Sequence, residues 1–207
     1  MFETLLSLQP KIAAAKGGQS REDKVIELAT NVLLQLPEQI DYDTTVQILK
    51  DDPSPLNVVL LQEIERYNQL LTVIKSSLED LKRAILGLVV MSNELEEAFT
   101  CIYETRVPPQ WASAYKSLKP LAAWTRDMVV RVEQFAKWAE QARAPHIFWM
   151  SAFTFPTGFL TAVLQASARQ NAVPVDSLSW EFTVFTVDDS NIQQAPQGKS
   201  FDFNLLK

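Results

Sequence analysis

Residues 55–91 read PLNVVLLQEIERYNQLLTVIKSSLEDLKRAILGLVVM, and this stretch decides the fold. Apolar side chains recur along it with separations that alternate between four and three residues, which is the spacing of one helix face. The pattern predicts one very long helix over about 55–91, spanning roughly 55 Å at ~1.5 Å per residue. The apolar stripe consists of Leu60, Ile64, Tyr67, Leu71, Ile74, Leu78, Leu81, Ile85 and Leu88.

Additional apolar residues beside this stripe, such as Val58, Leu70, Val73 and Val90, make the face broad. A broad apolar face favours packing against several elements over the narrow seam of a two-stranded coiled coil. We therefore expect the helix to lie along a large neighbouring surface. Self-association through residues 60–88 stays open as the alternative.

The remaining elements are also mostly helical. An N-cap serine at Ser20 opens a helix at 21–36, and Pro120 is expected at the first position of a helix that runs to about 142. The fold class is therefore mainly α, a helical bundle with one very long helix and a single C-terminal strand at 179–187. Similar patterns predict helices at 43–50, 93–104 and 156–171, and a helical turn within 110–119. The aromatic run 148–155 is interpreted as a buried plug of the core, and the polar tail after residue 188 as poorly ordered.

Composition restricts the possible functions. The protein has 207 residues, a net charge of −6 and one cysteine. It has no long basic run, so a nucleic-acid surface is not expected, and no apolar stretch long enough to span a membrane. A single cysteine cannot form an internal disulfide, which fits a reducing compartment. The first 16 residues lack the basic start and unbroken apolar stretch of a signal peptide.

No residue pattern predicts a catalytic, cofactor-binding or metal site. The triplet Gly198-Lys199-Ser200 matches the end of a phosphate-binding loop, but Gln193 stands where that loop requires glycine. His146 is the only histidine, so a metal site that needs two is excluded. Cys101 has no basic neighbour and is interpreted as a buried, unreactive thiol.

Two weaker chemical patterns have structural explanations. Ser151 and His146 could in principle serve a hydrolase, but the glycine-flanked turn that presents a nucleophilic serine is missing. The adjacent carboxylates at 51–52, 96–97 and 188–189 lie beside breaks or on polar helix ends, where turn and cap roles explain them better than acid–base catalysis. Residues alone therefore indicate a non-catalytic helical module, with a self-standing adaptor that dimerises as the main alternative.

Several segments, in consistent order over about 1–197, resemble the C-terminal region of dynein heavy chains. Residues 148–161, FWMSAFTFPTGFLT, are similar to an aromatic signature of that family that ends in Pro-x-x-Phe-Leu-Thr. The end of the preceding module is matched by residues 20–37. The other matching segments are 55–68, 78–87, 107–111, 115–121, Trp124, 168–169 and 174–178.

The resemblance implies a division of the protein into three parts. Residues 1–52 would be the small helical end of the last AAA module, and 53–178 the helical part of the C-terminal domain. Residues 179–207 would be a remnant strand and a disordered tail. In the family the strand at 179–187 leads into a β-barrel, whereas the residues after Gln197 do not resemble that continuation. We therefore expect a truncated product, a splice form or a partial gene model.

The resemblance also implies a role and a place. Dynein heavy chains are minus-end-directed microtubule motors driven by a ring of six AAA modules, with ATP sites in the earlier modules. Their C-terminal domain packs on the ring face and modulates motility. The expected partners are the motor ring and the other dynein subunits, with microtubules only indirect and neither nucleic acid nor membrane involved. The residues in these motifs are most similar to those of the axonemal branch of the family. The expected location is therefore the cytoplasm and cytoskeleton, and within them the ciliary axoneme.

Overall fold

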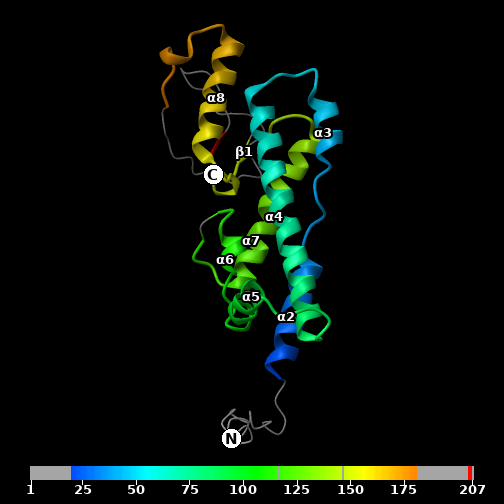
Figure 1. The fold of residues 1–207 in the computed structure, drawn as a ribbon. Coiled ribbons are helices and arrows are strands. Elements are labelled where there is room, and N and C mark those ends of the chain that lie inside the picture. Colours follow the sequence, from blue (N-terminus) through cyan, green and yellow to red (C-terminus); the bar gives the residue numbers. More distant parts are fainter. Residues whose placement is uncertain (1–19, 116, 146, 181–204, 207) are drawn as a thin grey trace, which may run out of the picture.

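A computed structural model of the protein describes residues 20–115, 117–145, 147–180 and 205–206. These residues form a helical bundle, so the predicted fold class, mainly α, is confirmed (Figure 1). The helices are α2 (Arg21–Gln35), α3 (Tyr42–Leu49), α4 (Pro55–Ile85), α5 (Asn93–Tyr103), α6 (Pro109–Ala112), α7 (Leu121–Gln141) and α8 (Pro156–Asn171). Short 3-10 turns, η1 (Met150–Ala152) and η2 (Val175–Ser177), flank α8.

The long helix α4 begins as expected but ends earlier than predicted. Ser54 accepts a hydrogen bond from the Leu56 amide at 3.3 Å, and Pro55 occupies the first turn, where its missing N–H is harmless. The helix closes at Ile85 because Gly87 adopts a left-handed φ of 73°. The Leu88 amide then donates to the Arg83 carbonyl at 2.9 Å, which is a Schellman termination. The expectation of helix up to residue 91 was wrong, because apolar residues continue past the glycine that stops the helix.

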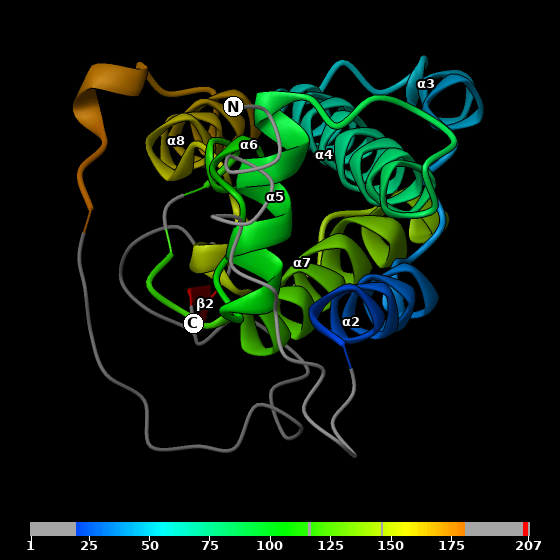
Figure 2. The same cartoon turned by 60° about the horizontal axis from the view of Figure 1, so that its bottom comes forward.

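The apolar stripe of α4 lies inside the protein's own core. Its seven members from Leu60 to Leu81 are at most 4% exposed. They are covered by α2, α3, α5, α7 and α8, all of which pack against α4 (Figure 2). The broad face is thus covered by several helices of the same molecule, and the expectation that it lies along a large neighbouring surface was wrong for the buried part of the stripe. This burial contradicts a dimerisation seam over 60–81, whereas Leu88 at the end of the stripe is 69% exposed.

The other predicted helices agree with the structure to within one residue at each end, whereas the helical turn expected over 110–119 is the shorter α6, which ends at Ala112. Pro120 was expected at the first helical position of α7, but it is the N-cap residue immediately before the helix. Three helices end on left-handed residues that are not glycine: Thr105 after α5, Ala142 after α7 and Ala172 after α8. A side chain in that conformation is strained, so these ends depend on the packing around them.

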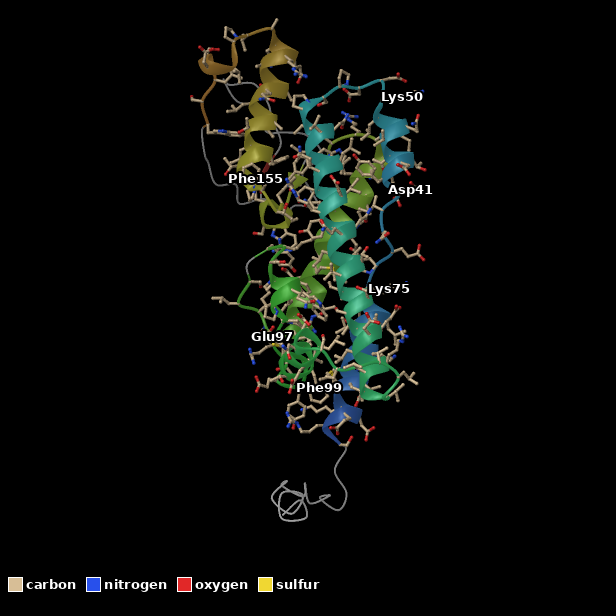
Figure 3. The ribbon with its side chains drawn as sticks, in the orientation of Figure 1. Asp41, Lys50, Lys75, Glu97, Phe99 and Phe155 are labelled. Atoms are coloured by element: carbon tan, nitrogen blue, oxygen red, sulfur yellow. The ribbon has the colours of Figure 1, made fainter. Side chains whose placement is uncertain are left out.

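The aromatic run forms a plug between α7 and α8. Phe153 stacks on Phe159 of α8 with ring centroids 4.1 Å apart, and Phe148 contacts the same ring at 4.7 Å. Trp138 of α7 meets Phe148 edge-on at 5.1 Å. The predicted core role is therefore confirmed for Phe148 and Phe153. Phe155, at the start of α8, is 55% exposed and does not take part (Figure 3).

The described strands are short and lie elsewhere than expected. Ile147–Phe148 (β1) pairs in parallel with Leu205–Leu206 (β2). Of the predicted strand 179–187, only residues 179–180 are described, and they are not in a strand; the remainder lies outside the described residues. The polar tail predicted to be poorly ordered also lies outside them, except for β2. No helix among the described residues combines the length and apolar composition that crossing a bilayer requires.

Candidate functional site

The residues considered for catalysis are only partly described. Ser151 is exposed on η1, whereas His146 lies outside the described residues. Gln193, Gly198-Lys199-Ser200 and the carboxylates at 188–189 also lie outside them. Within the described ranges, no group of three or more His, Cys, Asp or Glu side chains is placed to hold a metal ion.

Cys101 and the remaining carboxylate pairs take structural positions. Cys101 is buried on α5, and burial raises the pKa of its thiol, so the thiolate needed for nucleophilic attack is disfavoured. Asp52 accepts a hydrogen bond from the Asn57 side chain at 3.0 Å, which ties the preceding loop to the start of α4. Glu96 and Glu97 are exposed near the start of α5, where negative charge interacts favourably with the positive end of the helix dipole (Figure 3).

A buried carboxylate that sequence reasoning missed joins α4 to the aromatic run. Glu63 is fully buried, and its Oε2 accepts the Thr154 amide at 3.0 Å. Its Oε1 accepts the Thr154 hydroxyl at 3.0 Å and an Arg66 Nη1 proton at 3.0 Å. The Phe155 amide points to the same oxygen at 3.4 Å, immediately before α8 begins. The charge is therefore balanced by four donors, and it fixes the segment that leads into α8.

A second buried ion cluster lies on α7. Asp127 accepts Lys119 Nζ at 2.6 Å and Arg131 Nε at 3.0 Å through its two carboxylate oxygens. The Arg131 guanidinium lies over the Tyr115 ring, 4.2 Å from its centroid, and over the Trp149 ring at 4.9 Å. These contacts join the loop before α7 to the segment after it. Arg131 and Asp127 are buried, so the pair is shielded from solvent.

The electrostatics of this region favour fixed protonation states. Burial acts to raise the pKa of Asp127, but hydrogen bonds from Lys119 and Arg131 outweigh it, and the pKa is lowered. Burial raises the pKa values of Tyr67 and Tyr115 well above their usual range. Tyr67 accordingly stays protonated and donates to the Ala152 carbonyl at 2.6 Å. These groups support a rigid core and not proton transfer at neutral pH.

Sequence signals for both clusters exist, although they are weak. Glu63 falls between Leu60 and Tyr67 on the apolar face of α4, where an unpaired charge would be unfavourable. Asp127 and Arg131 are separated by four residues and so share a helix face with Trp124 and Phe135. A charged residue on an apolar face predicts a buried partner. The identity of that partner, 91 residues away for Glu63 and Thr154, is visible only in the fold.

One surface feature stands apart from this packed interior. The turn between α4 and α5, residues 86–91, exposes Leu86, Leu88, Val90 and Met91 and is called the apolar turn below. Val90 is 89% exposed. The Schellman termination holds the start of the turn, and Ser92 caps α5 at its end by accepting the Leu95 amide at 3.3 Å. Large apolar side chains held in water by a well-defined backbone are typical of an interaction site.

On the opposite side of the same end of the bundle, cation–π contacts join α2 to α5. Arg21 of α2 lies over the ring of Tyr103 of α5, 4.5 Å from its centroid, and over the ring of Phe99 at 5.9 Å, and Lys24 lies over the Tyr103 ring at 4.8 Å. Such contacts contribute about 0.5 to 1 kcal/mol each at exposed sites. They fasten the start of α2 to α5, so the first described helix is part of the same packed unit.

Comparison with known proteins agrees with the resemblance seen in the sequence. The family model for the C-terminal domain of the dynein heavy chain matches residues 1–201. Human dynein axonemal heavy chain 2 is 64% identical over 198 residues, covering 95% of this protein and 4% of that one. The Chlamydomonas reinhardtii dynein-1-beta heavy chain of the flagellar inner arm I1 complex is 47% identical over 199 residues, with the same coverage. Rat dynein axonemal heavy chain 1 is 40% identical over 210 residues, covering all of this protein and 5% of the rat one. The sequence thus spans a small fraction of the relatives' length.

Proposed function

This protein belongs to the family defined by the C-terminal domain of dynein heavy chains, and we propose that it serves as a non-catalytic part of an axonemal dynein motor. Its role in that motor is to pack on the ring of AAA modules and modulate movement along microtubules, toward their minus ends, in cilia and flagella. The observation that carries the proposal is the family match over residues 1–201, together with relatives that are axonemal heavy chains. The place of action is the cytoskeleton of the ciliary axoneme.

The architecture supports a mechanical role for the domain. The Glu63 and Asp127 clusters connect distant segments through charged hydrogen bonds, and the aromatic plug fills the space between α7 and α8. A bundle tied in this way moves as one body, which suits a part that bears on a larger ring. ATP hydrolysis is assigned to the remainder of the heavy chain, because the resemblance to the family implies that the ATP sites lie in the earlier AAA modules.

The division of the sequence follows from the same proposal. Residues 1–52 derive from the small helical end of the last AAA module, 53–178 form the helical part of the C-terminal domain, and 179–207 form the remainder. The described part of the first segment shares one hydrophobic core with the second, since Val25 and Ala29 join the same buried cluster as Leu78 and Ile102. This common core supports a firm attachment between the module and the domain.

Gliding of microtubules over purified motors tests the proposal. A complete axonemal heavy chain is compared with the same protein lacking the region equivalent to residues 53–178. We expect the microtubule-stimulated ATPase to persist and the gliding speed or processivity to change by at least twofold. An unchanged motor would contradict a modulating role.

A second assay concerns the 207-residue protein alone. It should not hydrolyse ATP, and turnover by a contaminant-free preparation would show that it contains a catalytic site. Sedimentation of the same preparation separates the proposed motor part from a self-standing adaptor. We expect a monomer, because the apolar stripe that could form a seam is buried within the molecule.

A further inference from the structure

We infer that the apolar turn, residues 86–91, is the point at which this domain docks onto the preceding part of its own heavy chain. The inference rests on the proposed function and specifies which surface makes the contact. Four large side chains are exposed there within six residues, whereas α4 immediately before the turn is packed on its apolar side. The turn therefore departs sharply from the pattern of the helix it follows.

The backbone holds these side chains outward. In a Schellman termination, the residue after the left-handed glycine commonly folds its apolar side chain back onto the last helical turn. Here that residue is Leu88, and the position it would cover is the exposed Arg83, which pairs with Asp80 at 3.5 Å. Leu88 instead remains 69% exposed. With Ser92 capping the next helix, the turn is a defined protrusion and not a loop that can bury itself.

The charges around the turn favour a protein partner. Lys82 and Arg83 flank it on the α4 side, and Glu94, Glu96 and Glu97 flank it on the α5 side. A rim with both signs complements the mixed surface of a protein. An anionic lipid surface would be repelled by the three carboxylates. The mixed rim therefore argues for a polypeptide occupant.

The size of the turn argues against a second copy as that occupant. A stable dimer buries about 800 Å² on each partner, contributed by about 20 to 30 residues. A six-residue turn supplies only a fraction of that area. A contact this small is effective when the partner is part of the same polypeptide, because covalent linkage raises the effective concentration to the millimolar range.

The position of the turn agrees with this occupant. In the relatives the matched region is 4–5% of a much longer heavy chain. The first described helix, α2, begins at the end of the bundle where the apolar turn lies (Figures 1 and 2). Sequence that precedes residue 20 is therefore joined to the bundle at the end where the turn lies.

Amide hydrogen exchange in the complete heavy chain tests the inference. Residues 86–91 should exchange at least tenfold more slowly in the complete heavy chain than in the 207-residue protein. If other parts of this domain are protected in the complete heavy chain but 86–91 are not, the inference is overturned and the proposed function stands. If no part of the domain is protected, ring packing itself fails.

Variants give an independent measurement. Leu88→Asp combined with Val90→Asp in the complete heavy chain should return exchange at 86–91 to the rate of the isolated protein. The matched control, Leu34→Asp with Leu118→Asp, changes two other exposed leucines and should leave the protection intact. Equal protection in both variants would overturn the inference. Concentration-dependent protection in the isolated protein, abolished by the first variant, would assign the turn to a second copy and also overturn it.

Discussion

The apolar stripe of α4 and the apolar turn that follows it are built from similar side chains and have opposite surroundings. Leu78 and Leu81 are fully buried, whereas Leu86 and Leu88, a few residues later on the same run, are largely exposed. The difference arises from Gly87, whose left-handed conformation ends the helix and redirects the backbone. The comparison teaches that an apolar stretch of sequence does not by itself show whether its side chains are buried. Its first part builds the interior, and its last part is available to another surface.

The largest expected effect comes from truncating one leucine in each region. Leu78→Ala should lower the free energy of unfolding by about 3 to 4 kcal/mol, because it opens a cavity in a closed core. Leu88→Ala should change it by less than about 0.5 kcal/mol, because its side chain is already in water. Urea unfolding followed by circular dichroism measures both. Equal effects would show that the turn is packed in solution and would break the comparison.

Glu63 tests whether the packed length also depends on a buried charge. Glu63→Ala removes the buried acceptor of the Thr154 and Phe155 amides and should cost about 3 kcal/mol, since two backbone donors and the Thr154 hydroxyl lose a charged partner. Glu79→Ala on the exposed side of the same helix is the control, with an expected change under about 0.5 kcal/mol. The measurement is chemical denaturation at neutral pH. A small loss for Glu63→Ala would mean that the aromatic plug holds its position without the carboxylate.

The ion cluster of Asp127, Lys119 and Arg131 on α7 should make the stability of the protein depend on pH in the acidic range. The pKa of Asp127 is lowered in the folded protein below its usual value of about 3.9, so its contribution is fully present above that pH. It is lost as the pH falls through the folded pKa. Asp127→Asn should therefore destabilise the protein by about 2 kcal/mol at pH 6, from the loss of charged hydrogen bonds.

Denaturation of wild type and Asp127→Asn across pH 2 to 6 checks this expectation. The gap between the two proteins should narrow as the pH drops below about 4, where the wild-type carboxylate also becomes protonated. A constant gap down to pH 2 would show that the aspartate acts through packing alone.

The smallest effect is expected at the boundary between the two regions. Gly87→Ala has open space for the added methyl, so only the left-handed backbone opposes it, at a cost of about 1 kcal/mol. The converse change, Ala172→Gly, should stabilise the end of α8 by a similar or smaller amount. Thermal unfolding of the two variants measures whether Gly87→Ala lowers and Ala172→Gly raises the stability of the protein. A neutral Gly87→Ala would indicate that the helix can continue into the turn, and the comparison would then rest on packing alone.

Local order in the sequence determined the secondary structure of the described residues. Helix caps such as Ser20 and Ser92 and the spacing of apolar residues along 60–81 place the helices to within a residue, because these signals act over one or two turns. The family was likewise recognisable from the order of its motifs. The end of α4 was predicted wrongly because the apolar residues continue beyond Gly87. The only local signal for the end of the helix is that glycine, which adopts a left-handed conformation.

Only the tertiary structure decided what each apolar or charged position contacts. Whether the stripe of α4 forms a dimer seam or an internal core depends on which helices return to cover it, and those lie far along the sequence. The partner of Glu63 is Thr154, and Arg131 lies between rings from separate segments, Tyr115 and Trp149. Burial is a property of the whole assembly of helices, so a leucine in the core and a leucine in the exposed turn remain alike until the protein is folded.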